Sequence, residues 1–221
     1  MTKGIILLSG GLDSAVLLAL RKVQEGDECI ALTLSYGQKH QKEILAAEQV
    51  AKYYGVEHLT MDVSPLFAIN PSASSLLRGS SKSIPMEKYA GVPSTYVPFR
   101  NGLFLSAATA LALQLNASYV ALAIHANDGA GNAAYPDCSE EFSDAMGRAI
   151  YLGSGIRISL KAPFVRASKA FIVSTGLRLG VPFHLTWSCY AGGDKPCGTC
   201  GTCIDRKVAM AINGINENEG D

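Results

Sequence analysis

The segment Ser9-Gly10-Gly11-Leu12-Asp13-Ser14 is the most informative part of this sequence. It follows an apolar run at residues 4–8 and leads directly into a second apolar run at 15–20, an order typical of strand, turn and helix. Two adjacent glycines allow successive backbone N–H groups to point at one anion, with a helix N-terminus behind them. The stretch therefore predicts a phosphate-binding loop. The alternative is an ordinary tight turn whose Ser or Asp only caps the helix.

The side chains of this loop extend the prediction to a nucleotide and its metal ion. The hydroxyls of Ser9 and Ser14 can donate to phosphate oxygens, and the carboxylate of Asp13 can hold Mg²⁺. The loop is not a Walker A loop, because no Gly-Lys-Ser/Thr follows, and it lacks the spacing of a dinucleotide fingerprint. The full string resembles the PP-loop of the N-type ATP pyrophosphatases, which cleave ATP to AMP and pyrophosphate. That resemblance implies ATP and Mg²⁺ as cofactors, bound by Leu8, Ser9, Gly10, Gly11, Leu12, Asp13 and Ser14.

Composition favours one sizeable domain that acts on small molecules. The chain has 221 residues, 48% of them hydrophobic, which is enough for one large core. Nineteen basic residues balance nineteen acidic ones, so the net charge creates no general attraction to nucleic acid or to an anionic membrane. No apolar run reaches the length of a membrane span, and the first one enters a glycine loop instead of a cleavage site. We therefore predict a cytoplasmic protein without a nucleic-acid or membrane partner.

Strand and helix patterns alternate along the chain. Apolar runs predict strands at 4–8, 29–34, 56–61, 119–124 and 156–160, and helical spacing predicts helices at 13–24, 41–54, 103–115, 139–150 and 169–179. This alternation is typical of a parallel sheet with helices on both faces. The predicted fold class is a Rossmann-like α/β fold.

The periodicity lapses between residues 62 and 94, where Pro, Ser and Gly accumulate. We interpret this segment as an exposed excursion with a short helix near 64–69. A structureless connection of this length is unusual in a compact domain, so a substrate lid or an oligomer contact is favoured over an idle loop. The sequence does not choose between these two roles.

Polar side chains gather where the predicted fourth strand ends. His125 and Asp128 follow the strand, and Tyr135, Asp137 and Cys138 come shortly after. Because ligands of open α/β sheets bind outside the carboxyl ends of strands, these residues form a candidate site. The carboxylate of Asp137 could accept hydrogen bonds from a guanine-like amino group and ring N–H, or it could only cap the helix that begins near residue 139.

Arg100 and Asn101 lie at the start of the apolar, buried helix predicted over 103–115. A cation and an amide at a helix start beside a sheet edge suit an anionic ligand. The alternative is an arginine that only satisfies nearby carbonyl groups.

Four of the six cysteines lie close together near the C-terminus. Cys197, Cys200 and Cys203 repeat at intervals of three, and one loop can bring in Cys189. Disulfides or redox chemistry are the alternatives, but in a reducing cytosol such crowding favours metal ligation, and four thiolates form a closed zinc site. We therefore predict Zn²⁺ on these cysteines. Residues 1–183 would form the PP-loop ATP-binding domain, and 184–221 a small zinc-binding segment with a closing helix at 204–212, packed on the same domain.

Taken in order, the motifs resemble one family over nearly the whole chain. They are S-G-G-L-D-S at 9–14, Y-G-Q-K-H at 36–40, V-P-F-R-N at 97–101, Y-P-D-C at 135–138, S-K-A-x-I-V at 168–173, V-P-F-x-L-T-W-S-C-Y at 181–190, and the cysteine cluster. The family is 7-cyano-7-deazaguanine synthase, the nitrile-forming enzyme of queuosine and archaeosine precursor biosynthesis. The resemblance implies a homodimer with ATP, Mg²⁺ and Zn²⁺.

The implied substrates are 7-carboxy-7-deazaguanine and ammonia. ATP would convert the carboxylate to an acyl adenylate, ammonia would displace AMP to give an amide, and a second activation would dehydrate the amide to the nitrile. The resemblance implies catalytic roles for Asp13, Arg100 and Lys169. The implied substrate-binding residues are Tyr36, Gln38, Arg100, Asn101, His125, Asp128, Tyr135, Asp137 and Cys138.

Three positions depart from the family pattern. Phe99 stands in place of a small residue, Ser139 in place of an arginine, and Phe171 in place of a glutamate, and the stretch 128–135 looks longer than usual. These changes fall on motifs of the acceptor side, so a relative that stops at an amide or uses another amine is an alternative. A zinc-stabilised nucleotide-binding module without catalysis is a third reading, which the intact Asp13 and the full polar cluster oppose.

Overall fold

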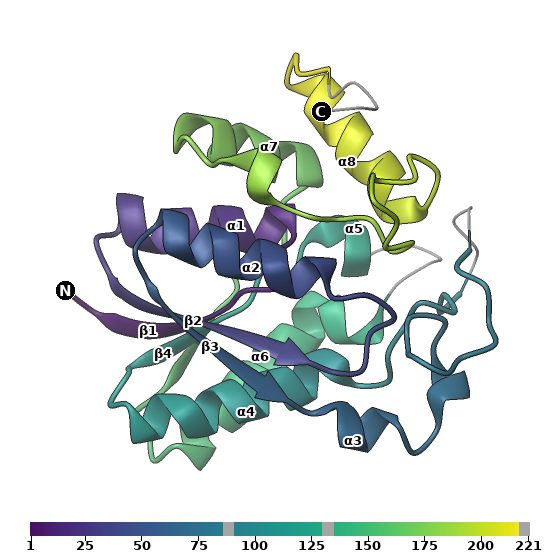
Figure 1. Ribbon diagram of the computed structural model, residues 1–221. Coiled ribbons are helices and arrows are strands. Elements are labelled where there is room, and N and C mark those ends of the chain that lie inside the picture. Colours follow the sequence, from purple (N-terminus) through teal and green to yellow (C-terminus); the bar gives the residue numbers. More distant parts are fainter. Residues whose placement is uncertain (86–90, 130–134, 217–221) are drawn as a thin grey trace.

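The structure of the protein is a computed structural model that describes residues 1–85, 91–129 and 135–216 (Figure 1). Its strands are β1 (Lys3–Leu7), β2 (Glu28–Ser35), β3 (Glu57–Asp62), β4 (Tyr119–Ala121) and β5 (Ser159–Lys161). Its α-helices are α1 (Leu12–Ala19), α2 (Lys42–Tyr53), α3 (Ser64–Phe67), α4 (Arg100–Gln114), α5 (Ala126–Gly129), α6 (Glu140–Gly153), α7 (Lys169–Arg178) and α8 (Gly201–Ile212).

The five strands form one sheet in the order β3-β2-β1-β4-β5. All four pairings are parallel, with Ile5 opposite both Ile30 and Val120. This is a doubly wound order, in which the chain leaves β1 toward one edge and later returns to build the other. The predicted Rossmann-like α/β fold is confirmed.

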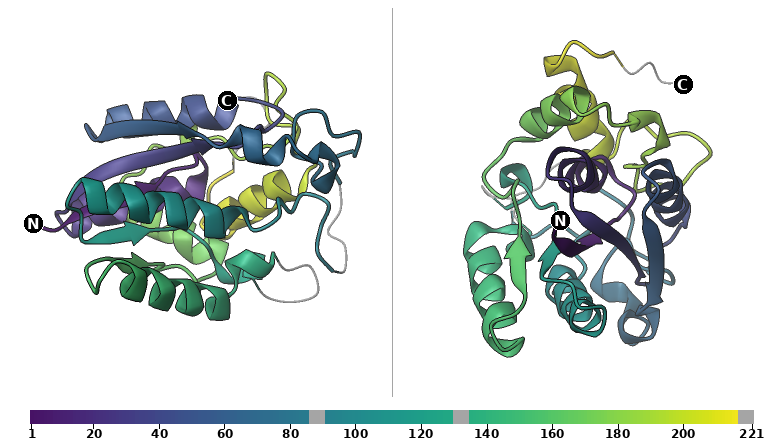
Figure 2. Two further views of the ribbon diagram at one scale, coloured as in Figure 1. Left: turned by 90° about the horizontal axis from the view of Figure 1, so that it is seen from below. Right: turned by 90° about the vertical axis from the view of Figure 1, so that its left-hand side faces the viewer.

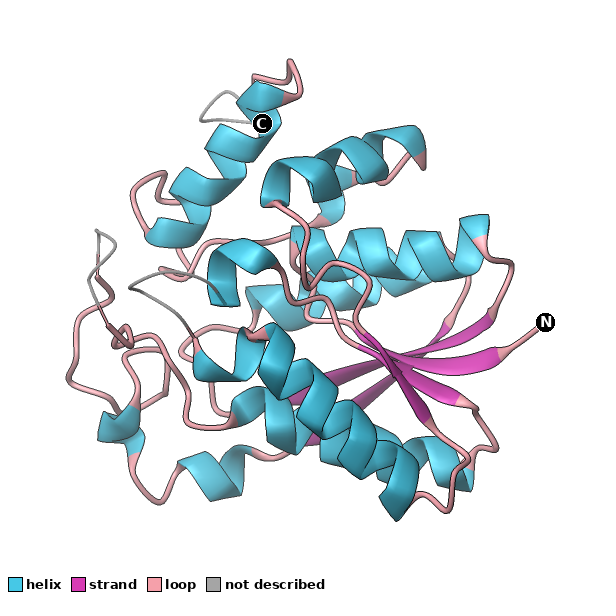
Figure 3. Cartoon of the chain, turned by 180° about the vertical axis from the view of Figure 1, so that it is seen from behind, coloured by secondary structure: helices cyan, strands magenta, loops and turns pink. Residues whose placement is uncertain are grey.

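Side chains of the central strand alternate between two apolar layers. Ile6 packs with α1, α2 and α7, whereas Ile5 and Leu7 pack with α4 and α6, because successive side chains of a strand point to opposite faces. Figure 1 shows α1, α2 and α7 above the sheet with α4 and α6 below it, and α8 beside α7. In the right-hand view of Figure 2, α8 lies behind α7 at the top of the molecule. Seen from behind, the long loops gather at one end of the sheet (Figure 3).

Several element boundaries differ from the predictions. Helix α4 begins at Arg100 instead of 103, because Asp137 accepts a hydrogen bond from the backbone N–H of Asn101 and so supplies a cap from elsewhere in the chain. Helix α1 ends at Ala19 and continues as a π-helix over Leu20–Gln24. Strands β4 and β5 are shorter than predicted, and α5 was not predicted. Residues 122–124, which follow β4, instead line the cavity described below.

The segment 62–94 is only partly the exposed excursion that the sequence predicts. Its short helix is present as α3. Leu76 and Leu77, however, are buried with Tyr36 and Val97, and Leu77 forms a bridge with Gln38. The prediction of exposure is wrong for this part, because a two-leucine anchor is too short to show periodicity. Residues 86–90 of the segment lie outside the described residues.

Helix α8 closes the molecule against α7. Ala209 and Met210 are buried in the same apolar layer as α1, so the predicted closing helix packs on the rest of the chain through these residues. It begins at Gly201 instead of 204, so Cys203 lies on the helix itself. Residues 217–221 lie outside the described residues. None of the helices described here is long and apolar enough to cross a membrane.

Candidate active site

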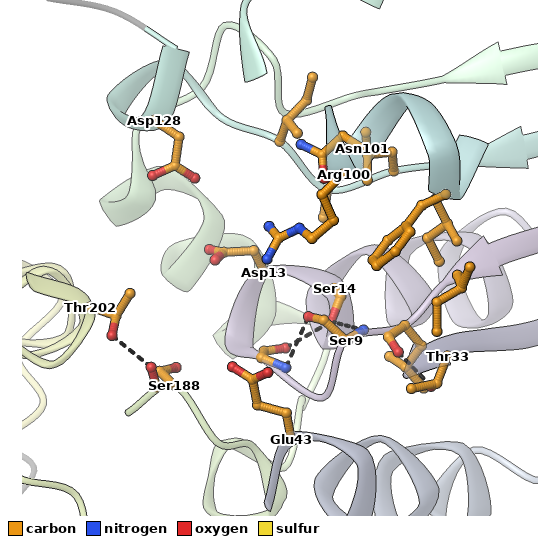
Figure 4. A pocket seen from close by; sticks show the side chains of 18 of the residues that line it. Ser9, Asp13, Ser14, Thr33, Glu43, Arg100, Asn101, Asp128, Ser188 and Thr202 are labelled. Atoms are coloured by element: carbon orange, nitrogen blue, oxygen red, sulfur yellow. Dashed lines mark hydrogen bonds between the residues drawn. The ribbon is translucent and has the colours of Figure 1, made fainter. Parts of the chain in front are cut away.

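A cavity of about 190 Å³ opens at the carboxyl ends of β1 and β4, where the strand order reverses. Open α/β sheets bind ligands at this point. Figure 4 shows Ser9, Asp13, Glu43, Arg100 and Asp128 around it. The predicted site residues that line it are Leu8, Ser9, Gly11, Asp13, Ser14, Tyr36, Gln38, Arg100, Asn101, Asp128, Tyr135, Cys138 and Lys169. Gly10, Leu12, His125 and Asp137 are not among its lining residues.

The predicted phosphate-binding loop joins β1 to α1. Gly10 has a φ of +82°, and a Cβ there would lie 2.0 Å from the carbonyl oxygen of Glu43, so only glycine fits. The N-cap of α1 is Gly11, which provides no side-chain hydrogen bond to the first N–H groups of the helix. Ser9 and Ser14 hold the turn, with 3.0 Å between their hydroxyl oxygens. An uncapped helix start above a glycine turn can bind an anion such as a phosphate.

Asp13 is the centre of a charged cluster at the loop. Its Oδ2 accepts a hydrogen bond from Nζ of Lys169 at 3.1 Å and lies 3.8 Å from Nε2 of His125. Burial would raise the pKa of Asp13, but Lys169 and His125 outweigh it, so the pKa is lowered and the group is a carboxylate. The pKa of Lys169 is raised, because Asp13 and Asp128 outweigh the effect of its own burial. The cluster therefore holds a fixed carboxylate and a fixed ammonium group beside the loop.

This cluster contains two carboxylates, a ligand type that divalent cations bind. Oδ1 of Asp13 is buried and has no hydrogen-bond partner among the described residues. The carboxylate of Asp128 lies across the cluster, 3.1 Å from Nε2 of His125, and burial raises its pKa. A buried carboxylate oxygen without a partner is costly, and a cation would satisfy it.

Arg100 forms the opposite wall of the cavity, at the start of α4. Its guanidinium lies over the rings of Tyr36 and Phe104, at 5.3 Å and 5.9 Å from their centroids. Burial would lower its pKa, but the neighbouring Tyr36 and Tyr190 outweigh that effect, so the group stays cationic. Within the described residues its guanidinium donates one hydrogen bond, a long one of 3.5 Å to the hydroxyl of Tyr36. No carbonyl group accepts from it in the described residues, so the guanidinium is available to an anion.

Asp137 does not cap the helix that follows it. Ser139 caps α6 instead, accepting a hydrogen bond from the N–H of Phe142. Asp137 accepts from the N–H of Asn101 at 2.9 Å, and Asn101 donates to the carbonyl of Asp137 and to Sγ of Cys138. The alternative that Asp137 caps the helix near 139 is therefore wrong, because a serine next to the helix start does so. The observed contacts fix the start of α4, and hence the backbone of Arg100.

Several lining residues were not singled out from the sequence. Glu43 of α2 faces the cavity, Tyr190 closes it, and Thr202 and Asp205 of α8 reach it from the C-terminal segment. Thr33 of β2 also lines it and donates to the carbonyl of Leu8 at 2.6 Å. A polar residue inside an apolar strand is a signal that could have identified Thr33. The remaining residues reach the cavity from elements far apart in the sequence, and no local sequence pattern marks them as site residues.

The four predicted metal ligands meet in space. The sulfur atoms of Cys189, Cys197, Cys200 and Cys203 all lie within 4.8 Å of one another. Backbone N–H groups point at two of them, at 3.3 Å from Cys197 to the sulfur of Cys189 and 3.3 Å from Cys200 to that of Cys197. These bonds stabilise thiolates and orient them, so the cluster can hold one metal ion.

The cysteine segment also touches the loop. The N–H of Trp187 donates to the carbonyl of Gly10 at 2.9 Å, and the hydroxyl of Thr202 donates to the carbonyl of Ser188 at 2.6 Å. The Trp187 ring also lies 4.7 Å from Nζ of Lys42. The metal-binding segment therefore forms one wall of the cavity.

Comparison with known proteins shows the family to which this chain belongs. The family model described as "Queuosine biosynthesis protein QueC" matches residues 3–214. The chain belongs to this family. Among relatives named 7-cyano-7-deazaguanine synthase, that of Archaeoglobus fulgidus is 43% identical over 97% of this chain and 88% of its own length. That of Caldicellulosiruptor saccharolyticus is 41% identical over 97% of this chain and 93% of its own. The family predicted from the motifs is confirmed, and the protein is an enzyme of this group.

Solved structures support the fold alone. The NMN synthetase of Francisella tularensis matches 98% of this chain and 79% of its own, with a TM-score of 0.52 and 21% identity. The U34-tRNA thiolase NcsA of Methanococcus maripaludis matches 96% of this chain and 65% of its own, with a TM-score of 0.51 and 12% identity.

Proposed function

We propose that the chain converts 7-carboxy-7-deazaguanine and ammonia to 7-cyano-7-deazaguanine with ATP. One observation carries the proposal: the uncapped loop with its Asp13–Lys169 pair and the cationic Arg100 wall face each other across one cavity. Such an arrangement can hold a polyphosphate and an anionic acceptor in contact, which is the main requirement of acyl transfer through an adenylate. The names of the relatives supply the identity of the product, and the family resemblance implies the substrate.

In the first step, a substrate carboxylate oxygen attacks the α-phosphorus of ATP, and pyrophosphate leaves. The N–H groups at the start of α1 and the hydroxyls of Ser9 and Ser14 would hold the departing phosphates. Lys169 would screen the charge that develops as the P–O bond breaks. Asp13 would hold Mg²⁺ together with Asp128, and that ion supplies charge neutralisation on the pyrophosphate.

In the second step, ammonia attacks the acyl carbon and AMP leaves with the former carboxylate oxygen, which gives the amide. The amide oxygen then attacks the α-phosphorus of a second ATP, and pyrophosphate leaves. The nitrogen loses its two protons to solvent, the C–O bond breaks, and the oxygen departs with AMP to leave the nitrile. Arg100 would face the substrate carboxylate or the adenylate phosphate throughout. Tyr36, Gln38, Tyr135 and Cys138 would line the deazaguanine site. Asp137 and His125, which do not line the cavity, remain predicted substrate residues whose access requires a rearrangement.

The cysteine cluster would hold Zn²⁺ as a structural ion. Four thiolates leave no open position for substrate, and the segment braces Gly10 through Trp187. Residues 1–183 would then form the ATP-binding domain, and residues 184–221 a zinc-binding segment packed on it. The free cysteines fit a cytoplasmic location, and the homodimer remains a prediction that analytical ultracentrifugation tests.

The second candidate is an enzyme that stops at the amide, favoured by the departures at Phe99, Ser139 and Phe171. None of these three residues lines the cavity. Phe99 packs on Gly102 and Phe142, and Ser139 caps α6. Their positions outside the cavity support the nitrile over the amide.

One experiment tests the proposal. The protein is incubated with ATP, Mg²⁺ and 7-carboxy-7-deazaguanine, with and without ammonia, and the products are identified by mass. We expect AMP and the nitrile with ammonia present. An amide that persists at long times supports the second candidate, and no substrate-dependent AMP contradicts both.

A further inference from the structure

Glu43 is a cavity-lining carboxylate to which the reaction above gives no role. It belongs to the first turn of α2, whose backbone packs directly against the loop at Gly10. Its carboxylate has no hydrogen bond or ion pair among the described residues. In Figure 4 it projects into the cavity below Ser9 and Asp13, on a different segment from either Arg100 or Asp128. Glu43 is therefore an unpaired acid at the boundary between the phosphate loop and the acceptor wall.

The charged and titratable groups around Glu43 come from three elements. Arg100 of α4 attracts its carboxylate, and Tyr36 and Tyr190 face it from the end of β2 and from the cysteine segment. Its neighbour Lys42 lies over the ring of Trp187 and beside Asp194. Burial raises the pKa of Glu43 to about 7 even though Arg100 acts to lower it. Glu43 can therefore both take up and release a proton near neutral pH.

We propose that Glu43 is the general base that deprotonates the incoming ammonium ion for attack on the acyl adenylate. The inference rests on the proposed function and adds a catalytic residue to it. The carboxylate stands beside the loop that would hold the departing pyrophosphate and opposite Arg100, which would face the adenylate. A cation bound by Glu43 would therefore lie between these two groups, next to the acyl carbon.

The step balances as follows. Ammonium transfers one proton to the Glu43 carboxylate, the free electron pair of nitrogen forms a bond to the acyl carbon, and the bond from that carbon to the AMP oxygen breaks. AMP leaves as the anion, and the second proton lost from nitrogen and the one held by Glu43 pass to solvent. A base is needed because at neutral pH ammonia is present mainly as the ammonium ion, which has no free electron pair.

The test compares two half-reactions in Glu43→Gln. Carboxylate-dependent exchange of labelled pyrophosphate into ATP reports adenylation, and amide formation from ammonium reports the second step. We expect exchange to stay within about twofold of wild type and amide formation to fall about a hundredfold at pH 7. Hydroxylamine, a much weaker base that is a free amine at this pH, should form the hydroxamate at nearly the wild-type rate.

The pH profile gives an independent readout. Wild-type amide formation should rise with pH through about 7, as Glu43 loses its proton. In Glu43→Gln the rise should occur only at the higher pH where ammonium itself deprotonates. Glu48→Gln, an exposed acid on the same helix, is the matched control and should behave as wild type.

Two results overturn the inference while leaving the proposed function standing. They are wild-type amide formation by Glu43→Gln, and loss of pyrophosphate exchange together with amide formation, which would assign Glu43 to the phosphate site. Absence of carboxylate-dependent exchange in the wild-type protein overturns the proposed function, and this inference with it.

Discussion

The two halves of the cavity are assembled in different ways. The phosphate half is local: one loop and the first turn of α1 supply Ser9, Asp13 and Ser14 within six residues. The acceptor half is distributed, with Arg100 from α4, Tyr135 before α6, and Tyr190 from the cysteine segment. In the phosphate half the backbone forms the site, so its geometry depends on Gly10 and its negative charge on Asp13. In the acceptor half each side chain depends on packing elsewhere, so single substitutions should alter affinity and leave the chemistry of ATP intact.

The largest expected effect concerns the phosphate half. Asp13→Asn removes the carboxylate that would hold Mg²⁺, so that ion would no longer balance the charge of the departing pyrophosphate. We expect the fold to remain intact and substrate-dependent AMP release to fall at least about a hundredfold. Circular dichroism and AMP assays check this. AMP release at the wild-type rate would show that Asp13 is not needed for the reaction of ATP, and would contradict its assignment to the phosphate half.

The next largest effect is expected in the cysteine segment, which forms one wall of the cavity and contacts both halves. Cys200→Ser removes a buried thiolate, so zinc content, solubility and Tm should fall together, because a closed thiolate site contributes directly to folding. Cys197→Ser, at the exposed cysteine, should lose zinc with a smaller change in Tm. The control is Cys29→Ala, a buried cysteine of β2 outside the cluster, which should keep its zinc. Zinc-free protein that stays folded and fully active would contradict a structural role.

A smaller effect is expected in the acceptor half. Arg100→Lys keeps the charge but loses the planar group that lies over Tyr36 and Phe104. We expect KM for the carboxylate substrate to rise about tenfold, while KM for ATP stays near wild type. The control is Arg166→Lys, at an exposed pair with Glu140, which should change neither constant. A rise in KM for ATP alone would contradict this assignment and show that Arg100 binds ATP.

The smallest effect separates packing from recognition at Asp137. Asp137→Ala removes the acceptor for the N–H of Asn101 and should cost about 1 kcal/mol of unfolding free energy. Asp137→Asn keeps an oxygen acceptor, so its stability should be close to wild type. If Asp137 also binds the deazaguanine, Asp137→Asn raises the substrate KM more than it lowers Tm. Unchanged kinetics would limit Asp137 to capping α4.

The same contrast explains what could be predicted from the sequence. The sheet, its helices and the loop follow from local periodicity and from Gly10, which no other residue can replace. The four cysteines were predictable from their spacing. Glu43 and Thr202 were not, because their position at the cavity depends on how α2 and α8 pack. The cap of α4 by Asp137 joins residues 36 positions apart, and no pattern within either segment indicates it.

The most direct test of the central claim follows the substrate oxygens. The carboxylate of 7-carboxy-7-deazaguanine is labelled with oxygen-18, and the AMP released with ammonia present is examined by mass. Transfer through an acyl adenylate predicts one labelled oxygen in each AMP. Nitrile formation predicts two labelled AMP molecules for each product, and an enzyme that stops at the amide predicts one. Unlabelled AMP would contradict the account, because the two halves of the cavity would then not join carboxylate and phosphate.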